Sequence, residues 1–190
     1  MLLLVGLGNP GSNYTNTRHN IGFKIIDAIN SHFKLSKQKP KFKGLLTTGN
    51  IESKKIYAIK PLTFMNNSGT AIKELIDYFK IDAKDVFVFH DDIDIDFGKI
   101  KAKFGGGSAG HNGIESIDKF IGKDYSRVRV GIGHPKQKKK VNNHVLEDFK
   151  EDEEEKIKEI TDSIVKLIPT LIDKKIDLFS SKVNQNLNGI

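Results

Sequence analysis

Residues 85–92 read Asp-Val-Phe-Val-Phe-His-Asp-Asp, a short apolar run that ends in polar side chains. So continuous a run predicts a β-strand buried on both faces, as in a parallel sheet covered by helices. Before it, apolar runs at 2–7, 45–48 and 55–60 predict strands, and helical spacing at 21–33 and about 68–80 predicts helices. This alternation predicts an α/β fold with a twisted, mixed and largely parallel sheet flanked by helices.

The remainder of the chain extends this pattern. Further elements are predicted as strands at 98–104 and 126–132, a helix at 112–121, a glycine-rich loop at 105–110 and basic loops at 34–43 and 136–140. A helical pattern then covers about 148–183, where Pro169 should break or kink the helix, and residues 184–190 should fray. We expect one domain over residues 1–190.

Composition excludes several classes of protein. The 190 residues contain no cysteine, which removes disulfides, zinc–thiolate sites and cysteine nucleophiles. The apolar start lacks a basic flank, and no apolar run approaches the roughly 18 residues of a membrane span. We therefore expect a cytoplasmic protein that does not use a membrane.

Charge is unevenly distributed along the chain. The net charge is +7, with basic side chains in excess over residues 1–146 and acidic ones in excess over 147–190. A basic body of this kind indicates a polyanionic partner. The alternative is that lysine, which supplies nearly all of the basic side chains, is simply the default surface residue of this protein.

Residues 6–11, Gly-Leu-Gly-Asn-Pro-Gly, match the dinucleotide fingerprint G-x-G-x-x-G after a strand. That fingerprint needs a helix to begin within it, so that the helix N-terminus meets the pyrophosphate. Here Pro10 and the polar run 12–20 intervene, and the expected acidic residue is missing because Asp27 lies inside a predicted helix. The pattern therefore argues against a nucleotide cofactor.

The residues best suited to chemistry follow predicted strands. Three histidines are predicted in loops beside amides and carboxylates: His19, His90 and His111. Histidine moves protons readily near neutral pH, and Asp91 is placed to orient one imidazole. Asparagines at 9, 66 and 112 are suited to positioning water or donating to an oxyanion. Because sites form where parallel strands end, we expect these groups at one edge of the sheet.

Other catalytic patterns are missing from the sequence. It has no HExxH motif, no helical pair of metal ligands and no G-x-S-x-G nucleophile motif. Direct attack by water, assisted by a general base and without a metal, is the simplest hydrolytic interpretation. The glycines at 105–110 suit either close approach to a phosphate or ribose, or a tight structural turn.

Several segments together resemble the bacterial peptidyl-tRNA hydrolases. In order, they are 5–11 (Val-Gly-Leu-Gly-Asn-Pro-Gly), 17–22 (Thr-Arg-His-Asn-Ile-Gly), 64–69 (Phe-Met-Asn-Asn-Ser-Gly), 90–92 (His-Asp-Asp), 105–113 (Gly-Gly-Gly-Ser-Ala-Gly-His-Asn-Gly) and 127–135 (Arg-Val-Arg-Val-Gly-Ile-Gly-His-Pro). The resemblance implies a monomeric α/β hydrolase without metal or cofactor. Its partner would be peptidyl-tRNA, bound at the acceptor stem and 3′ end.

The resemblance also implies roles for residues. His19 is similar to the family's catalytic base, Asp91 to the carboxylate that keeps this base in its working form, and Asn9 to the residue that distinguishes blocked from unblocked aminoacyl-tRNA. Asn66 and Asn112 correspond to residues that hold substrate and water. The remaining positions implied in substrate or tRNA binding are Tyr14, Phe64, Met65, Lys103, His111, Arg129 and Lys138.

Two further functions remain open alternatives at this level. The first is an RNA-binding module that lacks catalysis, against which the combination of His19 and Asp91 argues. The second is an esterase of small acyl esters, against which the basic body argues.

Overall fold

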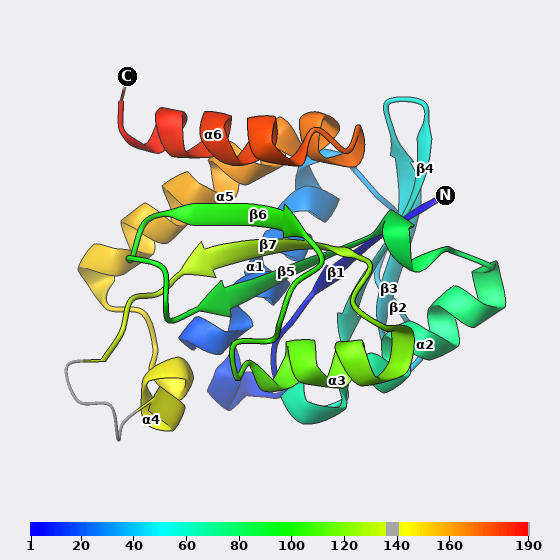
Figure 1. The fold of residues 1–190 in the computed structure, drawn as a ribbon, viewed down its shortest axis with the longest axis horizontal. Helices are drawn as coiled ribbons and strands as arrows, with labels where there is room; N and C mark the ends of the chain where they lie inside the picture. Colours follow the sequence, from blue (N-terminus) through cyan, green and yellow to red (C-terminus); the bar gives the residue numbers. More distant parts are fainter. Residues whose placement is uncertain (136–140, 190) are drawn as a thin grey trace.

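The structure, a computed structural model, describes residues 1–135 and 141–189. Within them, strands form one sheet in the order β2-β3-β4-β1-β5-β7-β6 (Figure 1). Their bounds are β1 (Leu2–Gly6), β2 (Lys39–Lys41), β3 (Gly44–Ile51), β4 (Lys54–Pro61), β5 (Val86–Asp92), β6 (Ile100–Phe104) and β7 (Ser126–Gly131). The predicted mixed sheet is confirmed.

The central strands β4, β1, β5 and β7 run parallel, whereas β3 and β6 join them by antiparallel pairing. The parallel strands therefore end at one shared edge, where sites form in such sheets. β6 ends at the opposite edge, because Phe104 pairs with Ser126 at the start of β7. The loop after β6 therefore does not begin at the edge where the parallel strands end. Residues 105–111 instead run back to bring His111 beside the end of β5.

Helices cover both faces of the sheet. They are α1 (Ile21–His32), α2 (Ser68–Phe79), α3 (Asn112–Ile121), α4 (Val141–Leu146), α5 (Glu151–Ile172) and α6 (Ile176–Leu187). Phe87 and Phe89 of β5 pack on the face covered by α1, α5 and α6. Val86 and Val88 pack on the face covered by α2 and α3 (Figure 1). This double burial explains the uninterrupted apolar sequence of β5.

Two short elements lie where the sequence does not predict them. β2 falls within the expected basic loop 34–43. Pro40 is tolerated there because β2 is at the edge of the sheet, where a missing N–H breaks no central ladder. α4 lies before the expected helix start at 148, and its six residues are too few to show a helical spacing.

The C-terminal helices also differ from expectation. α5 begins at Glu151 and continues through Pro169 to Ile172, so Pro169 does not break the helix, and the alternative of a kink stays a prediction. The missing N–H of Pro169 removes a hydrogen bond close to the end of the helix, where little helix remains to be disrupted. α6 reaches Leu187, so fraying does not begin at Asn184. The side chain of Asn184 instead accepts from Ile100 N at 3.0 Å and donates to Ile100 O at 2.8 Å.

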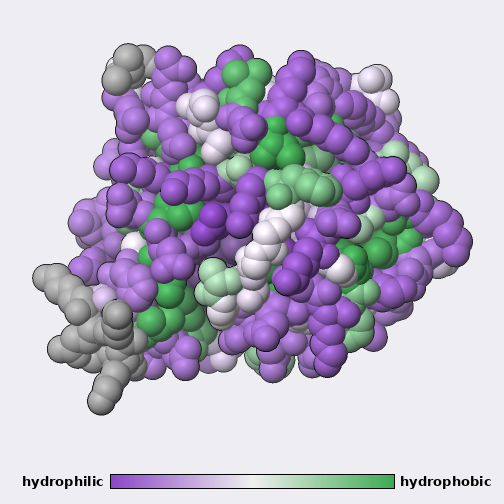
Figure 2. Space-filling model, viewed as in Figure 1, coloured by the Kyte–Doolittle hydropathy of each residue, from purple (hydrophilic) through white to green (hydrophobic). Residues whose placement is uncertain are grey.

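Polar side chains cover most of the face drawn in Figure 2, and apolar ones gather in small separate patches. Across the described residues, no helix has the length and apolarity needed to cross a membrane. The first turn of α5 carries four acidic residues, which the positive end of the helix dipole stabilises. The predicted basic loop 136–140 lies outside the described residues.

Candidate active site

His19 lies at the edge where the parallel strands end. It belongs to the short 3-10 helix Arg18–Asn20, directly before α1. The start of α1 lies tightly against β1 and β5, since a Cβ added to Gly22 would fall 2.3 Å from Leu7 N and 2.4 Å from Phe89 O. A residue other than glycine has no room there. Gly22 therefore permits the close packing that brings His19 beside the end of β5.

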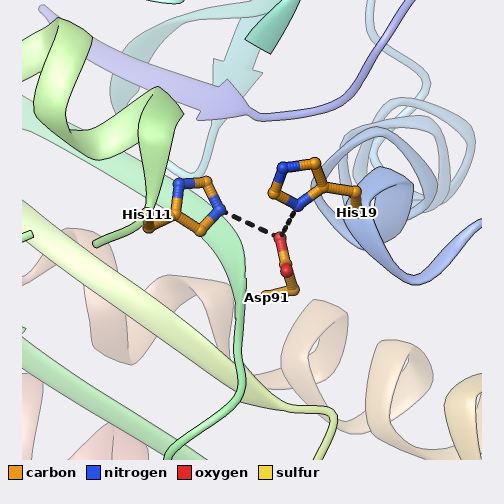
Figure 3. Close-up of side chains that lie close together, drawn as sticks. All are labelled: His19, Asp91 and His111. Carbon is orange, nitrogen blue, oxygen red and sulfur yellow. Dashed lines mark hydrogen bonds and ion pairs between the residues drawn. The ribbon is translucent and has the colours of Figure 1, made fainter. Parts of the chain in front are cut away.

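β5 places Asp91 next to His19. Asp91 is 1% exposed, and its Oδ1 accepts a hydrogen bond from Nδ1 of His19 at 2.8 Å (Figure 3). Burial acts to lower the pKa of His19, but the Asp91 carboxylate raises that pKa above its usual value. Burial also acts to raise the pKa of Asp91, while His19 and His111 hold that pKa well below its usual range. At neutral pH the Asp91 carboxylate is therefore ionised.

The second ring nitrogen of His19 is the one suited to chemistry. Nε2 has no hydrogen-bond partner among residues 1–135 and 141–189. Because Nδ1 carries the hydrogen donated to Asp91, neutral His19 presents a lone pair at Nε2. His19 lines two cavities, so a reactant in either one lies beside this residue.

His111 also contacts Asp91, with its Nε2 at 3.0 Å from the same Oδ1 (Figure 3). Its Nδ1 accepts hydrogen bonds from the backbone N–H groups of Gly113, at 3.1 Å, and Ile114, at 3.3 Å, at the start of α3. A neutral imidazole has one donor and one acceptor nitrogen, so Nε2 is the donor to Asp91. Both nitrogens are engaged within the protein, which leaves neither for the substrate contact that the resemblance implies.

His90 is buried inside β5, not in a loop as predicted. Its Nδ1 lies 2.7 Å from the backbone oxygen of Asp91, to which it donates. Burial lowers the pKa of His90 well below its usual value, and the nearby His111 lowers it further. His90 is therefore a neutral packing and hydrogen-bonding residue, away from the cavity walls.

The cluster of His19, Asp91 and His111 also has the composition of a metal site, with one potential ligand atom per residue within 4.8 Å of the others. An imidazole ligand must offer a lone pair to the metal. His111 instead directs a hydrogen at Asp91, because the amides of α3 occupy its other nitrogen. The arrangement therefore fits a hydrogen-bond network around a carboxylate better than it fits metal coordination.

Two cavities meet at His19. The first is lined by Asp91, Asp92, Ile93, Val141 and residues 108–112, and the second by Asn9, Phe64, Met65, Asn66 and Leu146; both also include His19, Asn112, Asn142 and Val145. We call the second cavity the cleft. The cleft brings His19 together with half of the ten residues that the resemblance assigns to substrate or tRNA binding: Asn9, Phe64, Met65, Asn66 and Asn112.

Asn9 is held rigidly at the wall of the cleft. Its side-chain Oδ1 accepts from Met65 N at 2.8 Å. The side chain of Asn20 makes two hydrogen bonds to the Asn9 backbone. It accepts from the Asn9 N–H at 2.8 Å and donates to the Asn9 carbonyl at 2.9 Å. Because Oδ1 is taken, the Nδ2 donor is the group that Asn9 has available for a ligand.

The outer part of the cleft is exposed. Asn66 and Asn112 lie at the surface, and their side-chain amides have no partner in the described part of the chain. Phe64 is 57% exposed, and its ring lies edge-on to that of Tyr14, with 6.5 Å between the ring centres. We call Asn66, Asn112 and Phe64 the rim of the cleft.

The expected tRNA-binding residues lie on the last two strands of the sheet. Arg129 donates from Nε to Asp92 Oδ2 at 2.7 Å. Lys103 crosses the loop at Gly106, where an added Cβ would fall 2.3 Å from the lysine Nζ. Burial lowers the pKa of Lys103, as do the nearby arginines 129 and 127. The third expected residue, Lys138, lies outside the described residues.

Helix α4 contributes to the site although its sequence carries no predicted site residue. Asn142 and Val145 of α4 line both cavities. The segment after α4 is held by Arg18, whose guanidinium donates to Asp148 O at 2.5 Å and to Glu153 Oε2 at 2.6 Å. A local sequence pattern could not place this segment at the site, because its anchor joins residues more than a hundred positions apart.

Residues 3–189 match the family model described as peptidyl-tRNA hydrolase. The chain is 72% identical over 184 residues to the peptidyl-tRNA hydrolase of Pelagibacter ubique (strain HTCC1062), covering 97% of this chain and 99% of the relative. It is 47% identical to the peptidyl-tRNA hydrolase of Ehrlichia canis (strain Jake), in a match that covers 97% of this chain and 95% of that relative. The crystal structure of the Acinetobacter baumannii enzyme of that name matches with a TM-score of 0.91 at 34% identity, over 97% of this chain and 94% of that chain.

Proposed function

We propose a division of roles among the residues of the cleft, from the premise that this chain belongs to the peptidyl-tRNA hydrolase family. The protein is accordingly a hydrolase of peptidyl-tRNA. It cleaves the ester between the peptide and the 3′-terminal ribose and releases tRNA for reuse. The observation that carries the assignment of roles is the buried His19–Asp91 hydrogen bond, which leaves Nε2 of His19 beside the cleft.

His19 is the general base in this proposal. A water molecule gives a proton to Nε2, and its oxygen forms a bond to the ester carbonyl carbon. The bond from that carbon to the ribose 3′ oxygen then breaks, and His19 returns the proton to the departing oxygen. Asp91 stabilises the imidazolium between these steps without taking the proton itself. A positioned base typically accelerates such a reaction by about 10²–10⁴-fold.

Asn66 and Asn112 stabilise the oxyanion and hold the attacking water. Their amides face the cleft without internal partners among the described residues, so their donors remain available. A donor aimed at a developing oxyanion contributes about 2.7–4 kcal/mol in known cases. An ester activated in this way needs neither a covalent intermediate nor a metal.

Asn9 supports recognition of the blocked α-nitrogen. In peptidyl-tRNA this nitrogen belongs to a neutral amide, whereas in aminoacyl-tRNA it is a cation. The Nδ2 donor of Asn9 suits the carbonyl oxygen of that amide and offers nothing to a cation. The bond from Met65 N to Oδ1 supports this interpretation, because it fixes the orientation of the side-chain amide.

Lys103 and Arg129 bind phosphates of the acceptor stem, and Lys138 is proposed to join them. Such contacts position an RNA without reading its sequence, as a hydrolase of many different peptidyl-tRNAs requires. Tyr14, Phe64 and Met65 form the walls for the peptide and the 3′ end. We further infer that the protein acts as a monomer in the cytoplasm, where its substrate arises.

The test is release of the acyl amino acid from N-acetyl-aminoacyl-tRNA by the wild type and by His19→Ala, with EDTA present throughout. We expect rapid cleavage by the wild type and a loss of about 10²–10⁴-fold in the variant, with tRNA binding retained. An active His19→Ala variant would overturn the role of His19. Loss of wild-type cleavage on adding EDTA would overturn the metal-free mechanism.

A further inference from the structure

We propose that His111 is a positioning residue: helix α3 fixes its ring with the hydrogen on Nε2, and that hydrogen holds the Asp91 carboxylate in line with His19. The inference rests on the proposed role of His19 as the base. In this proposal His111 does not contact the substrate and acts through Asp91 within the protein.

The start of α3 fixes the orientation of the His111 ring. His111 is the N-cap residue of α3, and its Nδ1 accepts from the amides of Gly113 and Ile114. The first amides of a helix lack partners within the helix, so a side-chain acceptor at this position is strongly favoured. With the Nδ1 lone pair used in this way, the ring hydrogen must lie on Nε2.

The helix that holds the ring is itself fixed in place. Ser116 of α3 accepts a hydrogen bond from Gly69 N of α2 at 3.0 Å. Gly113 lies against Met65, since an added Cβ would fall 2.5 Å from the methionine sulfur. Because α3 is tied to its neighbours beside the cap, the position of the His111 ring is set by the fold.

The oriented ring in turn affects Asp91. Its Oδ1 receives two hydrogen bonds, from His19 at 2.8 Å and from His111 at 3.0 Å. Two donors from separate elements, converging on this one oxygen, restrict rotation of the carboxylate. They also share its negative charge, so His111 limits how strongly Asp91 holds the proton on His19. A base must release its proton to the leaving oxygen, and the His111 hydrogen bond favours that release.

The surrounding charged groups do not duplicate this effect. On β5, His90 lies with its ring centre 4.8 Å from that of His111 and is neutral, since burial lowers its pKa well below the usual value. Also on β5, Asp92 is paired with Arg129 of β7. The ring centres of His19 and His111 lie 4.9 Å apart. Asp91 is therefore the carboxylate through which His111 acts on His19.

A helix cap alone would also explain the position of His111, and His111→Asn separates the two roles. Asparagine is among the best N-cap residues, so this variant keeps an acceptor for the α3 amides. Its shorter side chain replaces the imidazole donor to Asp91. His111→Ala removes both interactions, and His32→Asn, at the exposed far end of α1, is the matched control for the substitution itself.

We expect His111→Asn to keep the wild-type melting temperature and KM, to lose about tenfold in kcat, and to move the acid limb of the kcat/KM profile to higher pH. The shift is upward because Asp91, freed of one donor, holds the His19 proton more strongly. NMR titration of the His19 ring should show the same upward shift without any reference to catalysis. His111→Ala should also melt about 2–4 °C lower, from the lost cap.

Three results would overturn the proposal. An unmoved His19 titration in His111→Asn would show that His111 does not act through Asp91. A higher KM with unchanged kcat would make His111 a substrate contact. If His111→Asn melted as low as His111→Ala and its acid limb did not move, His111 would act only as a helix cap. Activity retained in His19→Ala would instead contradict the proposed base, whatever the His111 titration shows.

Discussion

Two regions of one cleft are built in opposite ways. In the cluster of His19, Asp91 and His111, both imidazole rings bond to Oδ1 of Asp91, and His111 also bonds to backbone amides, while Nε2 of His19 has no partner among the described residues. On the rim, Asn66 and Asn112 are exposed and their amides have no partner among the described residues. In the proposed mechanism, the cluster sets the charge state of Nε2 of His19, and the rim provides hydrogen-bond donors for the substrate.

The two regions differ in how closely they are tied to the folded core. The cluster organises its dipoles before the substrate arrives, which is the arrangement that electrostatic catalysis requires. It is also part of the folded core, because Asp91 and His90 belong to a central strand. Changes in the cluster should therefore alter the pH dependence, and changes on the rim should alter rates without altering the fold.

The largest effect is expected from Asp91→Asn in the cluster. The Asp91 charge raises the pKa of His19, so its removal should lower that pKa and move the acid limb of kcat/KM to lower pH. The plateau rate should fall by about 10³–10⁴-fold, because the imidazolium loses its counter-charge. The measurement is a pH–rate profile, with Asp92→Asn as the control that leaves the limb in place. An unmoved limb in Asp91→Asn would refute the role of the cluster.

A smaller loss is expected from Asn112→Ala on the rim. Removing one oxyanion donor should reduce kcat by about 10²–10³-fold. Since the side chain is exposed, the free energy of unfolding should stay within about 0.5 kcal/mol of wild type. Asn67→Ala is the matched control, because Asn67 is also exposed at the start of a helix and makes no capping bond. Equal losses in the two variants would contradict the assignment.

Specificity should change by about tenfold in Asn9→Asp, which is the order expected from adding one unit charge at a partly solvated site. An aspartate can still accept from Met65 N, so the local structure should be retained. Its second oxygen would present a negative charge that favours the free α-ammonium group. The ratio of kcat/KM for N-acetyl-aminoacyl-tRNA over aminoacyl-tRNA should therefore fall. An unchanged ratio would remove Asn9 from the account of specificity.

The smallest effect is expected from Gly106→Ala, outside both regions. The added Cβ would displace the Lys103 ammonium, so KM should rise a few-fold with kcat unchanged. The slope of log KM against log salt should become shallower by about one, as expected for the loss of one phosphate contact. Gly105→Ala is the control, because Gly105 also has a positive φ and its added Cβ comes no closer than 3.6 Å to another atom. If both variants behaved alike, Lys103 would not be a phosphate contact.

The fold could be predicted wherever burial leaves a strong local pattern. The run at 85–92 predicts β5, and the predicted helix 112–121 has the same limits as α3. The errors arise where distant contacts decide. β2 has three residues and gains its structure from pairing with β3, and Asn184 is ordered by hydrogen bonds to Ile100. Neither partner can be recognised from the local sequence.

The site shows the same limit. The residue types at 19 and 91 predict a base and its orienting group, because few other uses need both in adjoining loops. The roles of His111 and Arg18 could not be predicted, since they depend on which atoms face them. His111 could be assigned only once its nitrogens were seen to meet α3 and Asp91, and Arg18 only from its bonds to Asp148 and Glu153.

The most direct test of the central claim compares two titrations of the wild-type protein. One follows the His19 ring by NMR, and the other follows kcat/KM on N-acetyl-aminoacyl-tRNA. If His19 is the base, both should give one pKa above the usual value of about 6.5, because Asp91 raises it. A kinetic limb that falls elsewhere, with His19 titrating independently of activity, would contradict the account.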